Sequence, residues 1–339
     1  MKQPLVSVII PLREISYFLI FENLPAFEKQ SIKQFEVIVL PNEQTLYDLT
    51  LLKQYKWLRI VPTGTVTRPA MKRDIGAKQA KATILAFLDD DAFPTKNWIE
   101  MGIRSLKNKS VVASGGPGKI PPNAGSWELS FDQVLTSFVG SGGLDYRFTE
   151  GKKRFVDDFP SMNFFIKNET FKKLGGFNND YWPGEDSKLC NDIVYKENKK
   201  ILYDPNIVVF HHRRNALYDF LKQHANYGFH RGAFFAQGDS NSKRIAYLLP
   251  SLFIIYVLFL SVISVPILLF NVKIGLLFFT PFMLYVLLIL SIFFRACVKT
   301  KSVSVALRSA ITIGAMHTAY GILFFRGFKK GLSQKNIYG

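Results

Sequence analysis

Two long and almost uncharged stretches, residues 245–270 and 274–294, constrain the fold of this chain more than any other feature. Each is long enough to cross the hydrocarbon core of a bilayer as a helix. Only the tripeptide Asn271-Val272-Lys273 separates them, which predicts a helical hairpin. Basic residues flank the hairpin on both outer sides: Lys243, Arg244, Arg295, Lys299 and Lys301. Both ends are therefore expected on the cytoplasmic side of the membrane.

A third apolar stretch, residues 303–325, is interrupted by Arg308 and His317. If this stretch spans, the basic residues that follow it lie outside, against the positive-inside rule. A re-entrant segment, or a helix that packs on the hairpin, is the alternative. We therefore expect a transmembrane region over residues 243–339 with two or three hydrophobic helices.

The charged residues lie mainly before residue 245, and the net charge of the chain is +17. Such an excess attracts nucleotide phosphates and anionic lipid headgroups. Lys and Arg do not alternate with aromatic residues in one tract, so we expect no nucleic acid partner. The two cysteines are too few for a disulfide framework or a zinc cluster.

The first residues do not have the pattern of a signal peptide. The apolar run 5–10 is too short, and Pro11, Arg13 and Glu14 follow it. The run is instead typical of a buried strand. We expect a multi-pass protein of the cell (inner or plasma) membrane whose N-terminal domain stays in the cytoplasm.

Residues 1–214 alternate between apolar, β-branched runs and segments with a helical pattern. Strands are expected at 6–10, 35–40, 58–61, 83–88, 111–113, 161–167 and 206–210, and helices at 69–81, 96–107 and 185–199. This alternation predicts an α/β domain with a Rossmann-like, mostly parallel sheet. Residues 215–242 are expected to form an amphipathic helix on the bilayer surface. An ordinary core-facing helix would give the same pattern.

Asp89, Asp90 and Asp91 follow directly on the strand predicted over 83–88. Three consecutive carboxylates repel one another unless a cation neutralises them. Ligands of open α/β sheets bind beyond the carboxyl ends of strands, and carboxylate oxygens suit Mg²⁺ or Mn²⁺. A solvated acidic turn is the alternative for a bare triplet. Its position at a strand end favours a metal site.

Two further segments carry candidate residues. Gly184-Glu185-Asp186 opens a predicted helix, where a carboxylate could act as a general base or merely cap the helix. His211-His212-Arg213-Arg214 follows a predicted strand. A histidine there could complete a metal site, and an arginine could pair with phosphates.

With these segments in place, the order of elements resembles that of the family 2 glycosyltransferases with the GT-A fold. Four segments carry the resemblance: the opening strand 6–11, Arg73-Asp74-Ile75-Gly76, the strand 83–88 with its Asp run, and Gly184-Glu185-Asp186. Residues 223–227, Gln-His-Ala-Asn-Tyr, resemble a degenerate Gln-X-X-Arg-Trp element of membrane synthases. The hydrophobic helices of the C-terminal region resemble those of exopolysaccharide and lipid-linked oligosaccharide transferases.

The resemblance implies a role for each matching residue. Asp186 would be the base, supported by Glu185. The metal ligands would be Asp91, Asp89 and His211, with His212 as a second choice. The nucleotide-sugar would contact Pro11, Arg13, Glu14, Asn42, Arg73, Asp89 and Asp90. The acceptor side would be formed by Trp182, Gln223, Asn226 and Tyr227.

The chain departs from the family pattern after its second strand. The family usually has an Asp there that recognises the nucleotide base, whereas this chain has Pro41-Asn42-Glu43. Arg13-Glu14 likewise replaces an acidic turn after the first strand. These departures leave the nucleotide open.

The function that the resemblance implies is metal-dependent transfer, with inversion, of a sugar from a nucleotide-diphosphate sugar. The acceptor would be a hydroxyl of a lipid-linked saccharide in cell-surface glycan synthesis. Two alternatives remain from the sequence. One is a metal-dependent nucleotidyl or phosphoryl transferase, and the other is a non-catalytic membrane protein with a glycosyltransferase-like fold.

Overall fold

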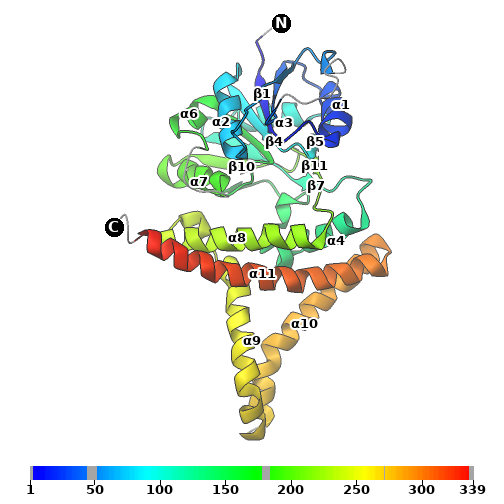
Figure 1. The fold of residues 1–339 in the computed structure, drawn as a ribbon, viewed down its shortest axis with the longest axis vertical. Coiled ribbons are helices and arrows are strands. Elements are labelled where there is room, and N and C mark those ends of the chain that lie inside the picture. The colour runs from blue at the N-terminus through cyan, green and yellow to red at the C-terminus, as the bar shows by residue number, and fades with distance from the viewer. Residues whose placement is uncertain (1–2, 44–51, 178–183, 271, 336–339) are drawn as a thin grey trace. The chain divides into compact units, whose positions relative to one another are not determined.

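The computed structural model describes residues 3–43, 52–177, 184–270 and 272–335. Contacts within the chain define two compact units (Figure 1). The first contains Met1–Pro121 and Tyr146–His212, and the second contains Pro122–Asp145 and Arg213–Gly339. Residues Pro122–Asp145 thus belong to the same unit as the C-terminal part of the chain, although they precede the boundary expected at residue 214. The division into three domains stays a prediction.

The first unit is built on a mixed sheet. Its strands are β1 (Val6–Pro11), β2 (Phe35–Leu40), β3 (Leu58–Ile60), β4 (Ile84–Leu88), β6 (Val111–Gly115), β8 (Arg154–Val156), β9 (Asn163–Lys167) and β10 (Lys200–Tyr203). They lie in the order β3-β2-β1-β4-β9-β6-β10-β8. β3, β2, β1 and β4 pair in parallel, as do β6 and β10. β9 runs antiparallel to both β4 and β6, and β8 is antiparallel to β10.

Helices cover both faces of this sheet, which is why its central strands are continuous apolar runs. On one face Val6, Val8 and Ile10 of β1 pack in a cluster with side chains of α1 (Leu24–Glu28) and α3 (Trp98–Ser105). On the other face lie α2 (Pro69–Gln79) and α6 (Asn168–Lys173). A Cβ on Gly76 of α2 would lie 2.7 Å from Ile9 Cγ2. This glycine therefore lets α2 approach β1 closely.

A small second sheet joins the segments that carry the candidate metal ligands. It consists of β5 (Ala92–Pro94), β11 (Val209–His211) and β7 (Gly118–Lys119), in that order across the sheet. β11 runs antiparallel to β5, with His211 opposite Ala92. His211 is thereby fixed beside the residue that follows the Asp run. The buried Asn163 of β9 supports this arrangement, because its Nδ2 donates to the carbonyls of Gly116 and Ile207, each at 2.8 Å.

The helices of the second unit are α4 (Ser126–Leu135), α5 (Phe138–Ser141), α8 (Leu217–Gln237), α9 (Ile245–Phe270), α10 (Val272–Thr300) and α11 (Val303–Lys335). α8 and α11 run side by side and in the same direction (Figure 1). Glycines line their contact. A Cβ on Gly232 would lie 2.1 Å from the Phe324 carbonyl oxygen, and one on Gly327 would lie 1.7 Å from that of Phe229.

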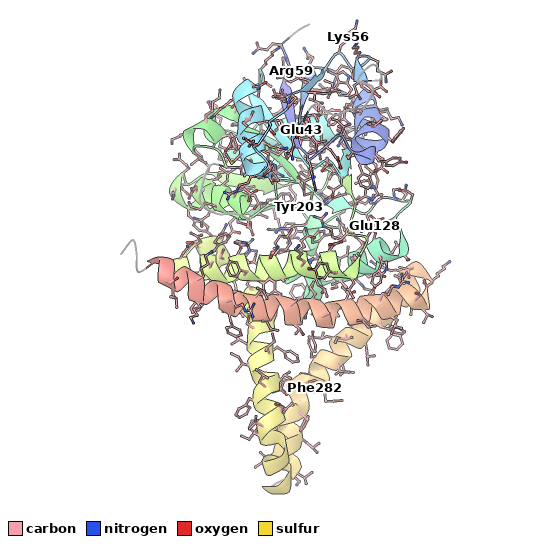
Figure 2. The ribbon with its side chains drawn as sticks, in the orientation of Figure 1. Glu43, Lys56, Arg59, Glu128, Tyr203 and Phe282 are labelled. Atoms are coloured by element: carbon pink, nitrogen blue, oxygen red, sulfur yellow. The ribbon has the colours of Figure 1, made fainter. Side chains whose placement is uncertain are left out.

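Among the described residues, two helices are long and apolar enough to cross a membrane, judged by length and composition alone. They are Ile245–Ile263 of α9 and Val272–Thr300 of α10, the two stretches expected from the sequence. Their side chains project outward from the pair, as Phe282 of α10 does in Figure 2. The third apolar stretch forms the first part of α11, which is not among these candidate spans.

Most expected elements are present, with several differences. The helix expected over 185–199 is α7 (Glu185–Asn191) continued by a π-helical turn, Asp192–Lys196. The strand expected over 206–210 begins only at Val209, and β10 before it was not expected. The segment 120–158, left unassigned from the sequence, supplies α4, α5 and β8.

Candidate active site

The three aspartates of the Asp run have different surroundings. All three lie between β4 and β5, where the central sheet passes into the small one. Asp89 Oδ1 accepts a hydrogen bond from Arg73 Nη2 at 2.7 Å. Asp91 Oδ1 lies 3.2 Å from His211 Nε2. Burial, with the like charges of Asp91 and Asp89, raises the pKa of Asp90 to about 6. The strand end therefore separates the carboxylates into three environments.

Asp89, Asp91 and His211 form a group suited to a divalent cation. One ligand atom of each lies within 4.8 Å of the others, and all three side chains are partly exposed. The set offers two carboxylates and one imidazole. Such a mainly oxygen set suits Mg²⁺ or Mn²⁺. Among the described residues His211 Nδ1 is buried without a hydrogen-bond partner. Its Nε2 lies beside the Asp91 carboxylate, so the residues fit the expected metal.

Arg73 connects the Asp run with the second acidic pair. Its guanidinium bonds Asp89 on one side and lies 3.5 Å from Glu185 Oε1 through Nη1 on the other. Its side chain is almost fully buried, and the ring of Phe177 lies 5.7 Å from its Cζ. Arg73 thus stands between two carboxylates that would otherwise repel each other. The sequence predicted a donor contact for Arg73 but no contact with Glu185.

Glu185 and Asp186 begin α7, as expected. Burial and the neighbouring Asp186 raise the pKa of Glu185 to about 7, while Arg73 opposes the rise. Burial and the nearby charge of Asp158 raise the pKa of Asp186. Backbone N–H groups hold the Asp186 carboxylate: Ser187 N donates to Oδ1 at 2.8 Å and Ser161 N to Oδ2 at 3.3 Å.

Asp158 is a buried carboxylate of this site that the sequence reading did not select. Ser187 Oγ donates to its Oδ1 at 2.8 Å, and Arg147 Nη2 lies 3.1 Å from its Oδ2. It lies in the segment that resisted assignment, and an isolated Asp157-Asp158 pair gives no signal of burial. Its charge is one reason why the pKa of Asp186 is raised.

Lys72 is a second buried charged residue of this site. This buried lysine extends from α2 to the ends of β1 and β2. Its Nζ donates to the carbonyls of Leu12 at 2.6 Å and Leu40 at 3.1 Å, and to Asn42 Oδ1 at 2.5 Å. Burial lowers the pKa of Lys72, and the charge of Asp90 opposes that shift. Asn42 therefore fills the position after β2 with its amide oxygen held by a lysine.

The remaining residues predicted for the donor side lie near the end of β1. Pro11 is the last residue of β1 and is buried. Arg13 and Glu14 are exposed, and the Arg13 carbonyl accepts a hydrogen bond from Asn42 N at 2.9 Å. The loops after β1 and β2 are thus joined. Contact of these three residues with a nucleotide stays a prediction.

The two histidines at the end of β11 have different partners. His212 Nε2 lies 2.8 Å from Glu22 Oε2, and its ring packs on Phe18. That leaves His211, the first choice from the sequence, in the metal group. Arg213 forms a buried ion pair with Asp132 of α4 at 2.9 Å, so it supports the second unit.

The segment that contains β1, β4, the Asp run and β9 also matches a family model. Residues 7–172 match glycosyl transferase family 2. This chain carries a family 2 glycosyltransferase domain. The resemblance seen in the sequence is thereby confirmed.

Whole-chain comparisons agree with this assignment. A mannosyltransferase structure, PcManGT from Pyrobaculum calidifontis in complex with GDP-Man and Mn²⁺, superposes with a TM-score of 0.56 at 18% identity. That match covers 98% of this chain and 88% of the other, and it confirms the GT-A fold.

Two curated relatives are also similar. A Methanococcus voltae dolichyl N-acetyl-α-D-glucosaminyl phosphate 3-β-D-2,3-diacetamido-2,3-dideoxy-β-D-glucuronosyltransferase is 23% identical over 311 residues, 89% of each chain. A pre-mycofactocin glycosyltransferase of Mycobacterium tuberculosis is 25% identical over 160 residues, 47% of this chain. This chain spans only 33% of the mycobacterial protein's length.

The residues predicted for the acceptor side lie outside the glycosyltransferase domain or outside the described residues. Gln223, Asn226 and Tyr227 are on α8 of the second unit, where Gln223 Nε2 donates to the Tyr227 hydroxyl at 3.0 Å. Asn226 and Tyr227 are exposed. Trp182 lies outside the described residues. The acceptor role of all four stays a prediction.

Proposed function

We propose that this chain transfers a sugar from a nucleotide-diphosphate sugar to a hydroxyl of a lipid-linked acceptor, in a membrane-associated and metal-dependent reaction. One observation carries the proposal: a candidate metal group and a buried Glu-Asp pair are joined by a single arginine, Arg73, in a family 2 glycosyltransferase domain. A nucleotidyl transferase would need the metal group but no such pair.

The chemistry that we propose is a single displacement. Asp186 accepts the proton of the acceptor hydroxyl, and the oxygen attacks the anomeric carbon from the face opposite the diphosphate. The bond between that carbon and the diphosphate oxygen breaks, and the nucleoside diphosphate leaves with the electron pair. One displacement inverts the anomeric configuration. The transition state resembles an oxocarbenium ion.

The surroundings of Asp186 suit a general base. A raised pKa strengthens a carboxylate as a proton acceptor, provided that it is ionised at the working pH. Two backbone N–H groups hold its oxygens in place. Arg73 helps to keep both acidic residues of α7 ionised, because its charge lowers their pKa values against the effect of burial.

Asp89, Asp91 and His211 would hold Mg²⁺ or Mn²⁺. A bound ion would neutralise charge that develops on the departing diphosphate. The similar mannosyltransferase was solved with Mn²⁺ and GDP-Man, which makes these the first metal and donor to try. Lys72 and Asn42 would shape the subsite for the nucleotide.

The acceptor and location follow from other features. Two candidate membrane helices and the name of the Methanococcus voltae relative, a dolichyl phosphosugar transferase, support a lipid-linked acceptor. The basic residues at both outer ends of the α9–α10 pair favour a cytoplasmic glycosyltransferase domain. Cell-surface glycan synthesis is the process that fits this arrangement.

The test uses the purified full chain with a panel of nucleotide-sugars, Mn²⁺ or Mg²⁺, and short polyprenyl-phosphosugar acceptors. Release of nucleoside diphosphate should need the metal, and NMR of the product should show inversion. Asp186→Asn should abolish transfer while donor binding persists. Asp192→Asn, which alters a carboxylate in the next turn paired with Lys188, is the matched control and should stay active. Full turnover by Asp186→Asn, or release of pyrophosphate, would overturn the proposal.

A further inference from the structure

The outer face of α11 carries an apolar stripe that Gly314 and the exposed Thr318 interrupt midway. Its large side chains are 39–56% exposed and recur at helical spacing: Leu307, Ile311, Ile322, Phe325 and Leu332. The opposite face is buried against α8, α9, α10 and α4. It includes Ser309, whose hydroxyl donates to the Ser130 carbonyl at 3.1 Å, and Phe324. One face of the helix is thus packed, and an apolar face remains exposed.

The charges on α11 are of one sign. Residues 303–335 contain no Asp or Glu. Arg308 is engaged within the unit, because it stacks on Trp127 at 4.6 Å and bonds Ser126 Oγ at 2.8 Å. Arg326, Lys329 and Lys330 are exposed near the end of the helix, next to the apolar stripe. This arrangement is complementary to an anionic surface that also accepts apolar side chains.

The position of α11 in the chain indicates which surface this is. α10, a candidate membrane span, ends at Thr300, and α11 begins at Val303. Only Lys301 and Ser302 lie between them. The start of α11 is therefore held within a few ångströms of a bilayer surface whenever α10 crosses the membrane.

We propose that α11 lies in the membrane interface, with its apolar stripe immersed among the lipid chains and Arg326, Lys329 and Lys330 binding anionic headgroups. The helix binds lipid along its length and does not cross the bilayer. Glycine-mediated packing fixes α11 to α8, so α11 also ties the second unit to the membrane surface. The sequence had given that interfacial role to α8, whose exposed side chains in its first half include Tyr218, Asp219 and Lys222.

Depth measurements on the full chain in lipid nanodiscs test the first part of the proposal. An environment-sensitive fluorophore is attached at Ile311→Cys or Ile322→Cys in a Cys297→Ser background, since Cys190 is buried. Lipids carrying a nitroxide near the headgroup should quench both labels more strongly than lipids labelled deep in the chain. A label at the exposed Lys107→Cys should not be quenched.

Two results would overturn this part. Stronger quenching by deep nitroxides at Ile322 would show that the helix crosses the bilayer. Absence of quenching at both positions would show that a second copy or another protein covers the stripe.

The charge requirement is tested by comparing nanodiscs of phosphatidylcholine alone with nanodiscs that also contain phosphatidylglycerol. Anionic lipid should increase the quenching at Ile322 by nitroxides near the headgroup, because each basic residue near an anionic surface favours binding of the helix to that surface by about fivefold. The triple variant Arg326→Gln, Lys329→Gln, Lys330→Gln should lose this increase. The control triple Lys107→Gln, Lys109→Gln, Lys172→Gln changes exposed lysines of the first unit and should keep it. An unchanged response in the α11 triple would refute headgroup binding.

Discussion

Gly327→Ala should strongly destabilise the second unit. A Cβ at this position of α11 would lie 1.7 Å from the Phe229 carbonyl oxygen and 2.6 Å from its carbon. A carbon atom does not approach a non-bonded oxygen this closely. The backbones of α8 and α11 must therefore separate by more than 1 Å to accommodate the methyl group. The obstacle is backbone rather than a flexible side chain, so no rotamer change relieves it. Gly232 and Gly331 would lose their close contacts as well.

The size of the effect follows from two opposing terms. Replacing glycine by alanine inside a helix favours the helix by about 1 kcal/mol. Overpacking costs about 1–3 kcal/mol, and separation of the helix pair adds to it. We therefore expect a net loss of about 2 kcal/mol or more.

The same helix offers a matched control, Gly314→Ala. The nearest atom to a Cβ there is Ile289 Cδ1 at 4.0 Å, which is an ordinary contact. This variant gains the helix propensity without the clash, so its stability should rise by up to about 1 kcal/mol.

Thermal unfolding of the purified chains in one detergent, followed by intrinsic fluorescence, measures the difference. Gly327→Ala should unfold several degrees below the parent and Gly314→Ala at or above it. Equal stability of the two variants would refute the glycine-mediated contact between α8 and α11.

Three further predictions concern the candidate site. Arg73→Met should move the acid limb of the pH–rate profile upward by about one unit or more, because the charge of Arg73 opposes the effect of burial on the pKa values of Asp186 and of Glu185, the latter being about 7 with Arg73 in place. Arg73→Lys should restore part of the shift, and an unmoved limb would contradict the role given to this ion pair. His211→Ala should raise the Mn²⁺ concentration needed for half-maximal activity by about tenfold or more, and calorimetric titration of Mn²⁺ should show the same weakening. Lys72→Met should lower the free energy of unfolding by about 3 kcal/mol because the buried carbonyls of Leu12 and Leu40 and the partly buried amide oxygen of Asn42 each lose a hydrogen bond, and urea denaturation that shows no loss would argue against it.

Much of the fold could be predicted because its signals are local. Strands β1, β2 and β4 are buried and mainly apolar, as sheet strands covered on both faces require, and the polar Ser7 and Glu36 within them bond each other. The Asp run follows β4 directly, so its place at the edge of a sheet needs only the strand assignment. The direction of β9 could not be predicted, since its sequence fits parallel and antiparallel pairing equally well.

The partners of the candidate residues could not be predicted either. Arg73 and Glu185 are 112 positions apart, and only the fold brings them together. His211 and His212 are adjacent, yet one faces Asp91 and the other faces Glu22. Neighbouring side chains of a strand point to opposite faces, and the pairing of β11 with β5 decides which side faces the Asp run.

By itself the sequence determined the elements, the acidic strand end and the two long apolar helices, because hydrophobic periodicity and length depend on neighbouring residues. The tertiary structure decided what distant segments make together. It paired Asp89 with Arg73 and Asp91 with His211, brought the Lys72 ammonium to Asn42, and packed the third apolar stretch against α8. The physical reason is the same in each case. A contact between residues far apart in the chain depends on strand order and helix packing, which no local pattern encodes.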